Sequence, residues 1–348
     1  MKRRGAIIGL GNVAVQGHLP GWLARPDVEI AAVTDARPAQ RAVAAAALPG
    51  ARWYDLPDAL LAEEPLDFVD VCTPPRSHAD LIVAALRRGC HVLCEKPLVS
   101  SPDELERVTR IADEQDRVLQ TVHNWHHAPI LRQAGELLRE GAIGSIRRAA
   151  WETLRMRPAA ASGPGAANWR VDPALAGGGV LTDHGWHVFY VLRSWLGEAR
   201  AVRAALERRR HVQWAVEDTA RVHVDFDGAS ADVFLTWAAE QRRNRVELTG
   251  ADGTLRLEDD TVVLLRDDGE QRWPCPPALS DGSTHPDWFG PVVERFLGAI
   301  AGGDGADNLA EAAACVAIEA AARESSHRGE RLVAIAPRPA GVRRDPAA

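Results

Sequence analysis

The chain has 348 residues, of which 46% are hydrophobic and 26% charged, and its formal net charge is -7. This composition is typical of a soluble globular protein with room for two domains. It lacks the long basic run of a nucleic-acid-binding protein and the roughly 18 consecutive apolar residues of a membrane helix. Five scattered cysteines without zinc-binding spacing predict reduced thiols and a cytoplasmic location.

The first third of the chain alternates between strand-like apolar runs and helix-like segments. Ser101 and Pro102 mark one helix start, as N-cap and first-turn residue. This alternation predicts a parallel, doubly wound sheet. Strands are predicted at residues 4–9, 28–35, 66–75, 90–97 and 117–123, and helices up to about residue 25 and at 38–48, 78–89 and 101–115.

The pattern changes near residue 123. A helix is predicted at about 129–140, and from about 199 to 265 strand-like segments follow one another with turn residues between them. Two closing helices are predicted at about 287–301 and 308–326. Consecutive strands without intervening helices predict an antiparallel or mixed sheet, so the second part of the chain forms a different sheet from the first.

A glycine-containing loop, Gly9-x-Gly11-x-x-Ala14, follows the first strand and precedes the first helix. Glycine permits a tight turn and close approach of the backbone to a pyrophosphate, and the helix start supplies amide donors. Asp35 ends the second strand about 20 residues later, where a carboxylate can bond ribose hydroxyls. These features predict a dinucleotide site, with a plain strand–helix turn as the alternative. The expected loop contacts are Gly9, Gly11, Asn12 and Val13.

The residues after the second strand bear on which dinucleotide binds. Asp35 favours NAD, because a carboxylate repels the 2'-phosphate of NADP. Arg37 stands two positions later and can accommodate that phosphate. NAD is therefore the expected cofactor, with NADP as the alternative.

Glu95 and Lys96 come at the end of the strand predicted at 90–97, on the sheet edge where open α/β folds bind ligands. A lysine there can hydrogen-bond a substrate oxygen and stabilise negative charge that develops on it. Taken alone, a surface Glu–Lys pair is the simpler interpretation.

The stretch "LTDHGWHV", residues 181–188, follows three glycines. On a helix, Asp183 and His187 are four positions apart and share a face. The pair could transfer protons. Thr182 or Asp183 could instead serve as the N-cap or first-turn acid of a helix. A third interpretation is a metal site that also uses His184, together with one of His123, His126 or His127. The metal interpretation is weaker, because adjacent residues diverge on a helix and because a metal leaves the dinucleotide loop unexplained.

The dinucleotide loop, "VCTPPRSH", "CEKP" and "GGGVLTDHGWH" occur in an order and spacing that resemble the Gfo/Idh/MocA oxidoreductase family. The resemblance covers nearly the whole chain. It implies a Rossmann domain at 1–123 and, at 124–348, an α/β domain with a large open mixed, mainly antiparallel sheet for substrate binding and oligomerisation. Members oxidise or reduce a hydroxyl or ketone of a sugar, cyclitol or related molecule with NAD or NADP, and need no metal.

The resemblance also assigns roles to residues. Lys96 matches a lysine that bonds the cofactor ribose and the reacting oxygen. His187 then acts as general acid/base, and Asp183 bonds a substrate hydroxyl or tunes His187. The positions matching the nicotinamide side or other cofactor contacts are Thr73, Pro74, His78, Glu95, Asn124, Trp169 and Arg170.

This chain departs from the family pattern around the substrate. "HNWHH" at 123–127 replaces a more common Asn-Arg-Arg, Tyr190 replaces an acidic residue, and His184 replaces an apolar one. These changes bear on the identity of the polyhydroxylated substrate more than on the reaction. A hydrolase or lyase that uses NAD transiently, and a sensor without catalysis, are the alternatives. A homodimer or homotetramer is expected, mainly from the resemblance, through a partly apolar sheet face.

Overall fold

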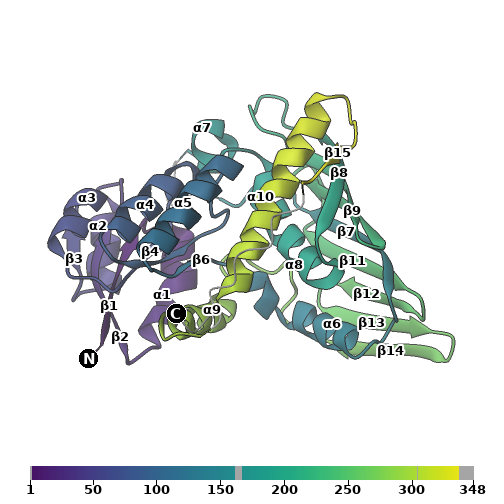
Figure 1. Ribbon diagram of the computed structural model, residues 1–348, viewed down its shortest axis with the longest axis horizontal. Coiled ribbons are helices and arrows are strands. Elements are labelled where there is room, and N and C mark those ends of the chain that lie inside the picture. Colours follow the sequence, from purple (N-terminus) through teal and green to yellow (C-terminus); the bar gives the residue numbers. More distant parts are fainter. Residues whose placement is uncertain (1, 161–166, 304, 337–348) are drawn as a thin grey trace.

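The computed structural model describes residues 2–160, 167–303 and 305–336. Within them the chain forms two β-sheets on either side of the long helix α10 (Ala306–His327), as Figure 1 shows. Six strands form the first sheet and nine form the second. None of the helices in these ranges combines the length and the apolar character needed to cross a membrane.

The first sheet is parallel throughout and has the order β3-β2-β1-β4-β5-β6, which confirms the predicted doubly wound sheet. Ser101 caps its helix as predicted, because its side chain accepts a hydrogen bond from the Glu104 amide at 3.2 Å. The strands are β1 (Arg3–Ile8), β2 (Val28–Thr34), β3 (Arg52–Tyr54), β4 (Phe68–Val71), β5 (His91–Cys94) and β6 (Leu119–Thr121); the helices are α1 (Leu19–Leu23), α2 (Gln40–Ala47), α3 (Pro57–Glu63), α4 (His78–Arg87) and α5 (Pro102–Glu114).

The second sheet is mixed, as predicted. Its central strand β7 pairs parallel with β10, and all its other pairings are antiparallel. The strands are β7 (Ile146–Leu154), β8 (Ala199–Glu207), β9 (Thr219–Phe226), β10 (Ala229–Thr236), β11 (Arg243–Gly250), β12 (Thr254–Glu258), β13 (Thr261–Arg266), β14 (Gly269–Pro274) and β15 (Val333–Ala334); the helices are α6 (Pro129–Arg139), α7 (Pro173–Ala176), α8 (Trp186–Leu196) and α9 (Pro286–Ile300).

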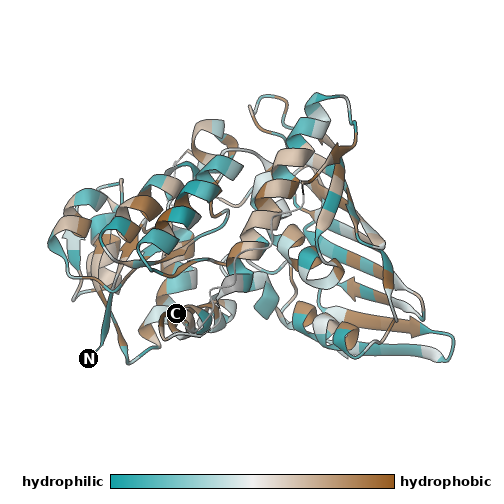
Figure 2. Ribbon diagram, in the orientation of Figure 1, coloured by the Kyte–Doolittle hydropathy of each residue, from teal (hydrophilic) through white to brown (hydrophobic). Residues whose placement is uncertain are grey.

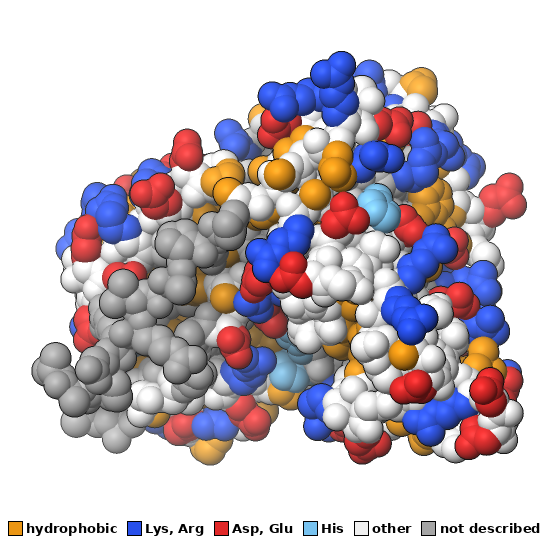
Figure 3. Space-filling model, turned by 45° about the vertical axis from the view of Figure 1, so that its right-hand side comes forward, with side chains coloured by type: hydrophobic (Ala, Val, Ile, Leu, Met, Phe, Trp, Pro, Cys, Tyr) orange, Lys and Arg blue, Asp and Glu red, His pale blue; other side chains and the backbone are white. Residues whose placement is uncertain are grey.

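Helices α6, α8 and α10 cover one face of the second sheet, and no other helix of the described residues covers the opposite, open face (Figure 1). Hydrophobic residues concentrate in the strands of both sheets (Figure 2). The open face carries ion pairs such as Arg148–Asp232 at 2.7 Å, together with half-buried apolar side chains such as Phe234. Cations and anions are also mixed over the described surface in Figure 3. The open face is therefore more polar than a fully apolar subunit interface.

Helix α9 returns to the first sheet from late in the chain. Phe289 and Phe296 of α9 meet Trp22 edge-on, and Trp22 stacks on Phe68 of β4 at 4.6 Å between ring centroids. A segment from the last fifth of the sequence thus completes the core beside the first helix. Its apolar face is stabilised by burial against the first sheet.

The side chain of Asn308 joins helix α10 to the edge strand of the first sheet. Asn308 accepts a hydrogen bond from the Thr121 amide at 2.8 Å and donates one to the Thr121 carbonyl oxygen at 2.9 Å. Both residues are buried. The Asn308 carboxamide therefore pairs with the backbone amide and carbonyl of β6, as a neighbouring strand would.

Replacing Asn308 by Ala would leave the buried amide and carbonyl of Thr121 without partners. We expect Asn308→Ala to lower the free energy of unfolding by about 1–3 kcal/mol, the desolvation cost of unpaired polar groups. Denaturant unfolding would measure the change. Asp307→Ala, at the exposed neighbouring position, is the control and should change the same quantity by about 0.5 kcal/mol or less; equal effects of the two variants would contradict the pairing.

Candidate active site

The loop after β1 makes a turn that only glycine can form. Gly9 has a φ of 96°, and a Cβ at this position would lie 2.8 Å from the carbonyl of Cys72. Only glycine fits both constraints. The Leu10 amide donates to the Asp35 carboxylate at 2.8 Å, which fixes the loop against the end of β2. Gly11, Asn12 and Val13 follow at the start of a helical segment, as predicted.

Asp35 and Arg37 form a pair at the end of β2. The Arg37 backbone amide and its Nε donate to Asp35 Oδ1 at 2.8 and 3.0 Å. Burial would raise the pKa of Asp35, but hydrogen bonds from Arg37 outweigh it and lower that pKa. The two residues that bear on the choice between NAD and NADP therefore sit together, and an ionised carboxylate is present at the predicted ribose position.

A pocket opens at the carboxyl edge of the first sheet, where the segment after β5 meets the segment that leads into α8. Lys96 Nζ donates to Asp183 Oδ1 at 2.9 Å and to the Asp183 carbonyl oxygen at 2.7 Å. The structure thus brings together two residues predicted from separate motifs, 87 positions apart. The pocket is lined by Pro75, Lys96, Pro97, Trp169, Arg170, Ala176, Gly178, Gly179, Thr182 and Asp183.

The Asp183 carboxylate is held in its ionised form. Burial would raise its pKa, but Lys96, His184 and Arg170 lower it well below the usual range. Arg170 Nε lies 3.7 Å from Asp183 Oδ2, and the Arg170 guanidinium lies over the Trp169 ring at 4.3 Å. Trp169 and Arg170 therefore line the pocket, and Arg170 adds a second cation beside Asp183.

His187 lies one turn beyond Asp183, largely buried at 8% exposure. Its ring stacks on Trp125 at 4.5 Å, and its Nδ1 lies 3.2 Å from the hydroxyl of Tyr190. Burial, followed by the charge of Lys96, lowers the pKa of His187 well below its ordinary value. The imidazole is therefore neutral near pH 7, the state in which it can exchange a proton or donate a hydrogen bond.

Neither Thr182 nor Asp183 is an N-cap, but Asp183 is an acid in the first helical turn, as one of the interpretations predicts. A π-helical turn, Leu181–Gly185, precedes α8 and has no side-chain cap of its own. Instead Glu217, from the loop between β8 and β9, accepts hydrogen bonds from the Gly179 and Leu181 amides at 3.0 and 3.3 Å. A Cβ on Gly179 would lie 2.0 Å from the Glu217 carbonyl oxygen. This contact requires glycine and leaves the Asp183 carboxylate available to Lys96.

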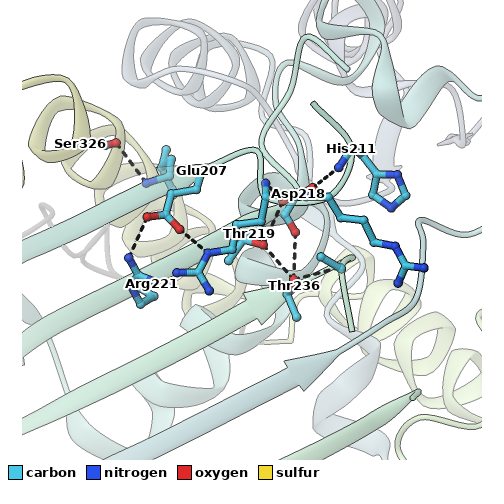
Figure 4. A network of polar contacts seen from close by, with 11 residues as sticks. Glu207, His211, Asp218, Thr219, Arg221, Thr236 and Ser326 are labelled. Carbon is cyan, nitrogen blue, oxygen red and sulfur yellow. Dashed lines mark hydrogen bonds and ion pairs between the residues drawn. The ribbon is translucent and has the colours of Figure 1, made fainter. Parts of the chain in front are cut away.

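Asp218 holds the loop that presents Glu217. Its carboxylate accepts hydrogen bonds from the backbone amides of Arg209, Arg210 and His211 at 2.7–2.9 Å, and Thr219 and Thr236 complete the network (Figure 4). These bonds lower the pKa of Asp218 although burial would raise it. The loop is thereby fixed against the ends of β9 and β10, and Glu217 with it.

A buried histidine that the sequence did not indicate, His18, holds Glu95, and Glu95 in turn bonds the backbone of Lys96. His18 Nδ1 lies 2.9 Å from Asp70 Oδ2, and its Nε2 lies 2.9 Å from Glu95 Oε1. The other Glu95 oxygen accepts from the Lys96 amide at 3.0 Å. Burial would lower the pKa of His18, but Asp70 and its hydrogen bonds raise it well above the ordinary value. An imidazolium therefore links the first helix to the Glu95–Lys96 pair.

The remaining predicted cofactor residues have mixed positions. Thr73 and Pro74 follow β4 and directly precede Pro75, which lines the pocket. Asn124 has a buried side-chain oxygen without a hydrogen-bond partner among the described residues. His78 is wholly buried, with its two ring nitrogens 2.8 Å from the carbonyl oxygens of Pro97 and Thr73. His78 therefore fastens two loops together and does not itself face the pocket.

Two groups within residues 2–160, 167–303 and 305–336 bring three possible metal-ligand atoms within 4.8 Å of one another, and neither contains Asp183, His184 or His187. One is His18, Asp70 and Cys72. In the other, His123 and His126 each lie 2.8 Å from a Glu311 oxygen, so the "HNWHH" segment contacts α10.

The sequence held one signal for the His18 network. Asp70 interrupts the apolar strand "DFVDVC", and a buried acid requires a partner. Nothing local indicates that this partner is His18, 52 residues earlier, or that Glu217 caps a segment 36 residues before it. Both contacts are tertiary.

A loop that admits a pyrophosphate, with a lysine, an acid and a histidine at the same sheet edge, is what hydride transfer with a dinucleotide requires. The structure thus defines the class of dinucleotide-dependent oxidoreductases. A model described as "Oxidoreductase family, NAD-binding Rossmann fold" matches residues 3–123, and one described as "GFO/IDH/MocA C-terminal domain" matches residues 131–256. The chain belongs to the Gfo/Idh/MocA family of oxidoreductases.

Individual relatives are dehydrogenases of sugars. The chain is 34% identical over 189 residues to D-glucoside 3-dehydrogenase of Escherichia coli K12, covering 53% of this chain and 51% of that protein. It is 29% identical over 287 residues to D-apiose dehydrogenase of Paraburkholderia graminis, covering 80% and 74%. The structure of levoglucosan dehydrogenase with NADH and levoglucosan superposes with a TM-score of 0.84 at 23% identity, covering 97% and 100%. The last comparison shows the fold.

The charge on His18 makes a testable contribution to stability. Its folded pKa is raised, so below about pH 6.5 both folded and unfolded chains hold the proton, and above it only the folded chain does. The contribution is therefore fully present below about pH 6.5 and is lost as pH rises through the folded value. We expect the destabilisation caused by His18→Gln, measured by urea unfolding, to shrink between pH 6 and pH 9.

His127 provides the control for this pH dependence. Burial lowers the pKa of His127 to about 4, so its contribution to stability is lost as pH falls below about 6.5 and is constant above it. His127→Gln should then show no trend between pH 7 and pH 9. A pH-independent effect of His18→Gln would mean that His18 is buried as a neutral ring.

Proposed function

We propose that the protein transfers a hydride between NAD and a hydroxyl or ketone carbon of a sugar, cyclitol or related polyol. The observation that carries this is the Lys96–Asp183 contact at the edge of a parallel sheet with a dinucleotide loop. Residues 1–123 bind the cofactor and 124–348 the substrate. The named substrates of the relatives, a glucoside and apiose, support a polyhydroxylated substrate.

The chain's residues fit a nicotinamide dinucleotide. Gly9 permits the tight turn of the loop at which the pyrophosphate is expected, and the ionised Asp35 stands where the adenosine ribose is expected. When bound, the cofactor supplies the hydride acceptor or donor. The catalytic residues are Lys96, His187 and Asp183: Lys96 and His187 contact the reacting oxygen, and Asp183 fixes Lys96. Thr73, Pro74, Glu95, Asn124, Trp169 and Arg170 shape the nicotinamide side of the site.

The setting of the protein is part of the same proposal. All five cysteines are free and buried, which fits a reducing cytoplasm. A homodimer or homotetramer formed through the open face of the second sheet is proposed from the extent of that face and its half-buried apolar side chains, such as Phe234 and Leu154.

Turnover with a panel of sugars, glycosides and cyclitols tests the reaction, followed by the absorbance of reduced nicotinamide. Lys96→Ala should lower kcat/KM about 10²–10³-fold, because one group that stabilises charge on the reacting oxygen is lost. The chain has only one other lysine, the exposed Lys2, so Lys2→Ala is the matched control and should keep full activity. Cofactor binding without net reduction on any substrate would favour transient oxidation in a hydrolase or lyase.

Cofactor preference tests the Asp35–Arg37 pair. Asp35→Asn keeps an oxygen for the Leu10 amide but removes the charge that repels a 2'-phosphate. We expect KM for NAD to rise about 10–100-fold, as for the loss of a charge-assisted hydrogen bond. The ratio of kcat/KM with NADP to kcat/KM with NAD should therefore rise. Arg37→Gln should raise KM for NADP and leave KM for NAD nearly unchanged. If neither variant changed the preference between NAD and NADP, residues other than Asp35 and Arg37 would recognise the ribose.

A further inference from the structure

Tyr190 and His187 share one face of α8, and their side chains meet in the interior. Tyr190 is wholly buried, and its ring stacks on His123 at 4.1 Å. Its hydroxyl lies 3.2 Å from Nδ1 of His187, whose own ring stacks on Trp125. Stacking on His123 and on Trp125 fixes the orientations of the Tyr190 and His187 rings. The hydrogen bond between them can then run in two directions: either the phenol O–H or the ring N–H is the donor.

The hydroxyl of Tyr190 has one proton to give and two lone pairs. It accepts a hydrogen bond from the backbone amide of Trp125 at 2.9 Å. Among the residues that the structure describes, the side-chain acceptor bonded to this hydroxyl is His187 Nδ1. If Nδ1 carried a hydrogen, the phenol proton would be buried without an acceptor, which is the costlier arrangement. The direction that satisfies every group is Tyr190 O–H donating to Nδ1.

His187 then carries its single hydrogen on Nε2. Burial and the nearby charge of Lys96 lower the pKa of His187, so the ring is neutral and has one N–H. With Nδ1 accepting from Tyr190, that N–H must be on Nε2. No residue in the described ranges forms a hydrogen bond with Nε2. Nε2–H is therefore available to a ligand as a donor and has no lone pair with which to accept a proton.

Lys96 supplies a second donor at the site. Two of the three positions around Nζ donate to Asp183, one to Oδ1 and one to the carbonyl oxygen. Lys96 also lines the pocket, so a further N–H of Nζ is available to a ligand oxygen.

We propose that Tyr190 fixes His187 as the Nε2–H tautomer, so that His187 donates a hydrogen bond to the reacting oxygen and has no free ring lone pair with which to accept its proton. The inference rests on the proposed function for the reaction, whereas the tautomer is a property of the free protein. It makes His187 a hydrogen-bond donor rather than a base, and it makes Tyr190 a positioning residue.

The tautomer can be read directly from nitrogen NMR of cofactor-free protein labelled with [15N]histidine. His187→Gln identifies the signals of His187. We expect the chemical shift of an unprotonated ring nitrogen at Nδ1 and of a protonated one at Nε2. The reverse pattern, or a doubly protonated ring, would overturn the proposal. Tyr190→Phe should abolish the preference for Nε2–H, and Tyr54→Phe, which changes the only other tyrosine of the chain, should leave the His187 signals unchanged.

Two substitutions of His187 separate a donor from a base. His187→Gln keeps an N–H donor near the position of Nε2 but cannot act as a base, and His187→Ala keeps neither. We expect Gln to hold kcat/KM within about tenfold of the parent and Ala to lower it about 10²–10³-fold. Equal losses in both variants would return the base to His187. If the parent oxidises no polyol, the proposed function fails, and the NMR pattern still decides the tautomer.

Discussion

The ion pair between Lys96 and Asp183 is the contact on which the geometry of the site depends. It joins the carboxyl edge of one sheet to the segment that enters α8 against the other, and both side chains are largely buried. A buried pair contributes little net stability, because desolvation offsets the attraction, yet losing either partner leaves a costly unpaired charge. The surrounding structure must therefore hold both groups in place: Glu95 and His18 on the Lys96 side, and Glu217 with the close-packed Gly179 on the Asp183 side.

The histidines show how local charge decides protonation within one fold. His18 lies between two carboxylates and carries a proton although it is buried. His184 and His187 lie near Lys96, and burial together with cations keeps them neutral, with the pKa of His184 lowered to about 3. Next to Glu95 the site thus holds an imidazolium between two acids, and next to Asp183 and in the following turn it holds neutral rings. Histidine therefore serves as a structural cation at position 18 and as a neutral hydrogen-bonding group at positions 184 and 187.

The sequence predicts the parts of the fold that depend on local patterns. The alternation of the first third, the glycine loop, the Ser101 cap and the run of strands after residue 199 all follow from short-range periodicity or turn chemistry. Strand β3, with three residues, and helix α3, with seven, are too short to show a period. At the site, motifs indicated Lys96, Asp183 and Asp35. The partners that fix them, such as His18 and Glu217, are distant in sequence and have no local signature. His78 matches the motif but does not line the pocket, because its two ring nitrogens face the backbone carbonyls of Pro97 and Thr73.

The bond between Asn308 and Thr121 also affects how the protein reaches its folded state. Strand β6 is an edge strand, and an uncovered edge can pair with a strand of another chain. Its cover, α10, lies almost 190 residues later, so during synthesis the first sheet has an open edge until nearly the whole chain has been made. The protein is therefore most exposed to association between unfinished chains at the stage when its cofactor-binding sheet has already formed.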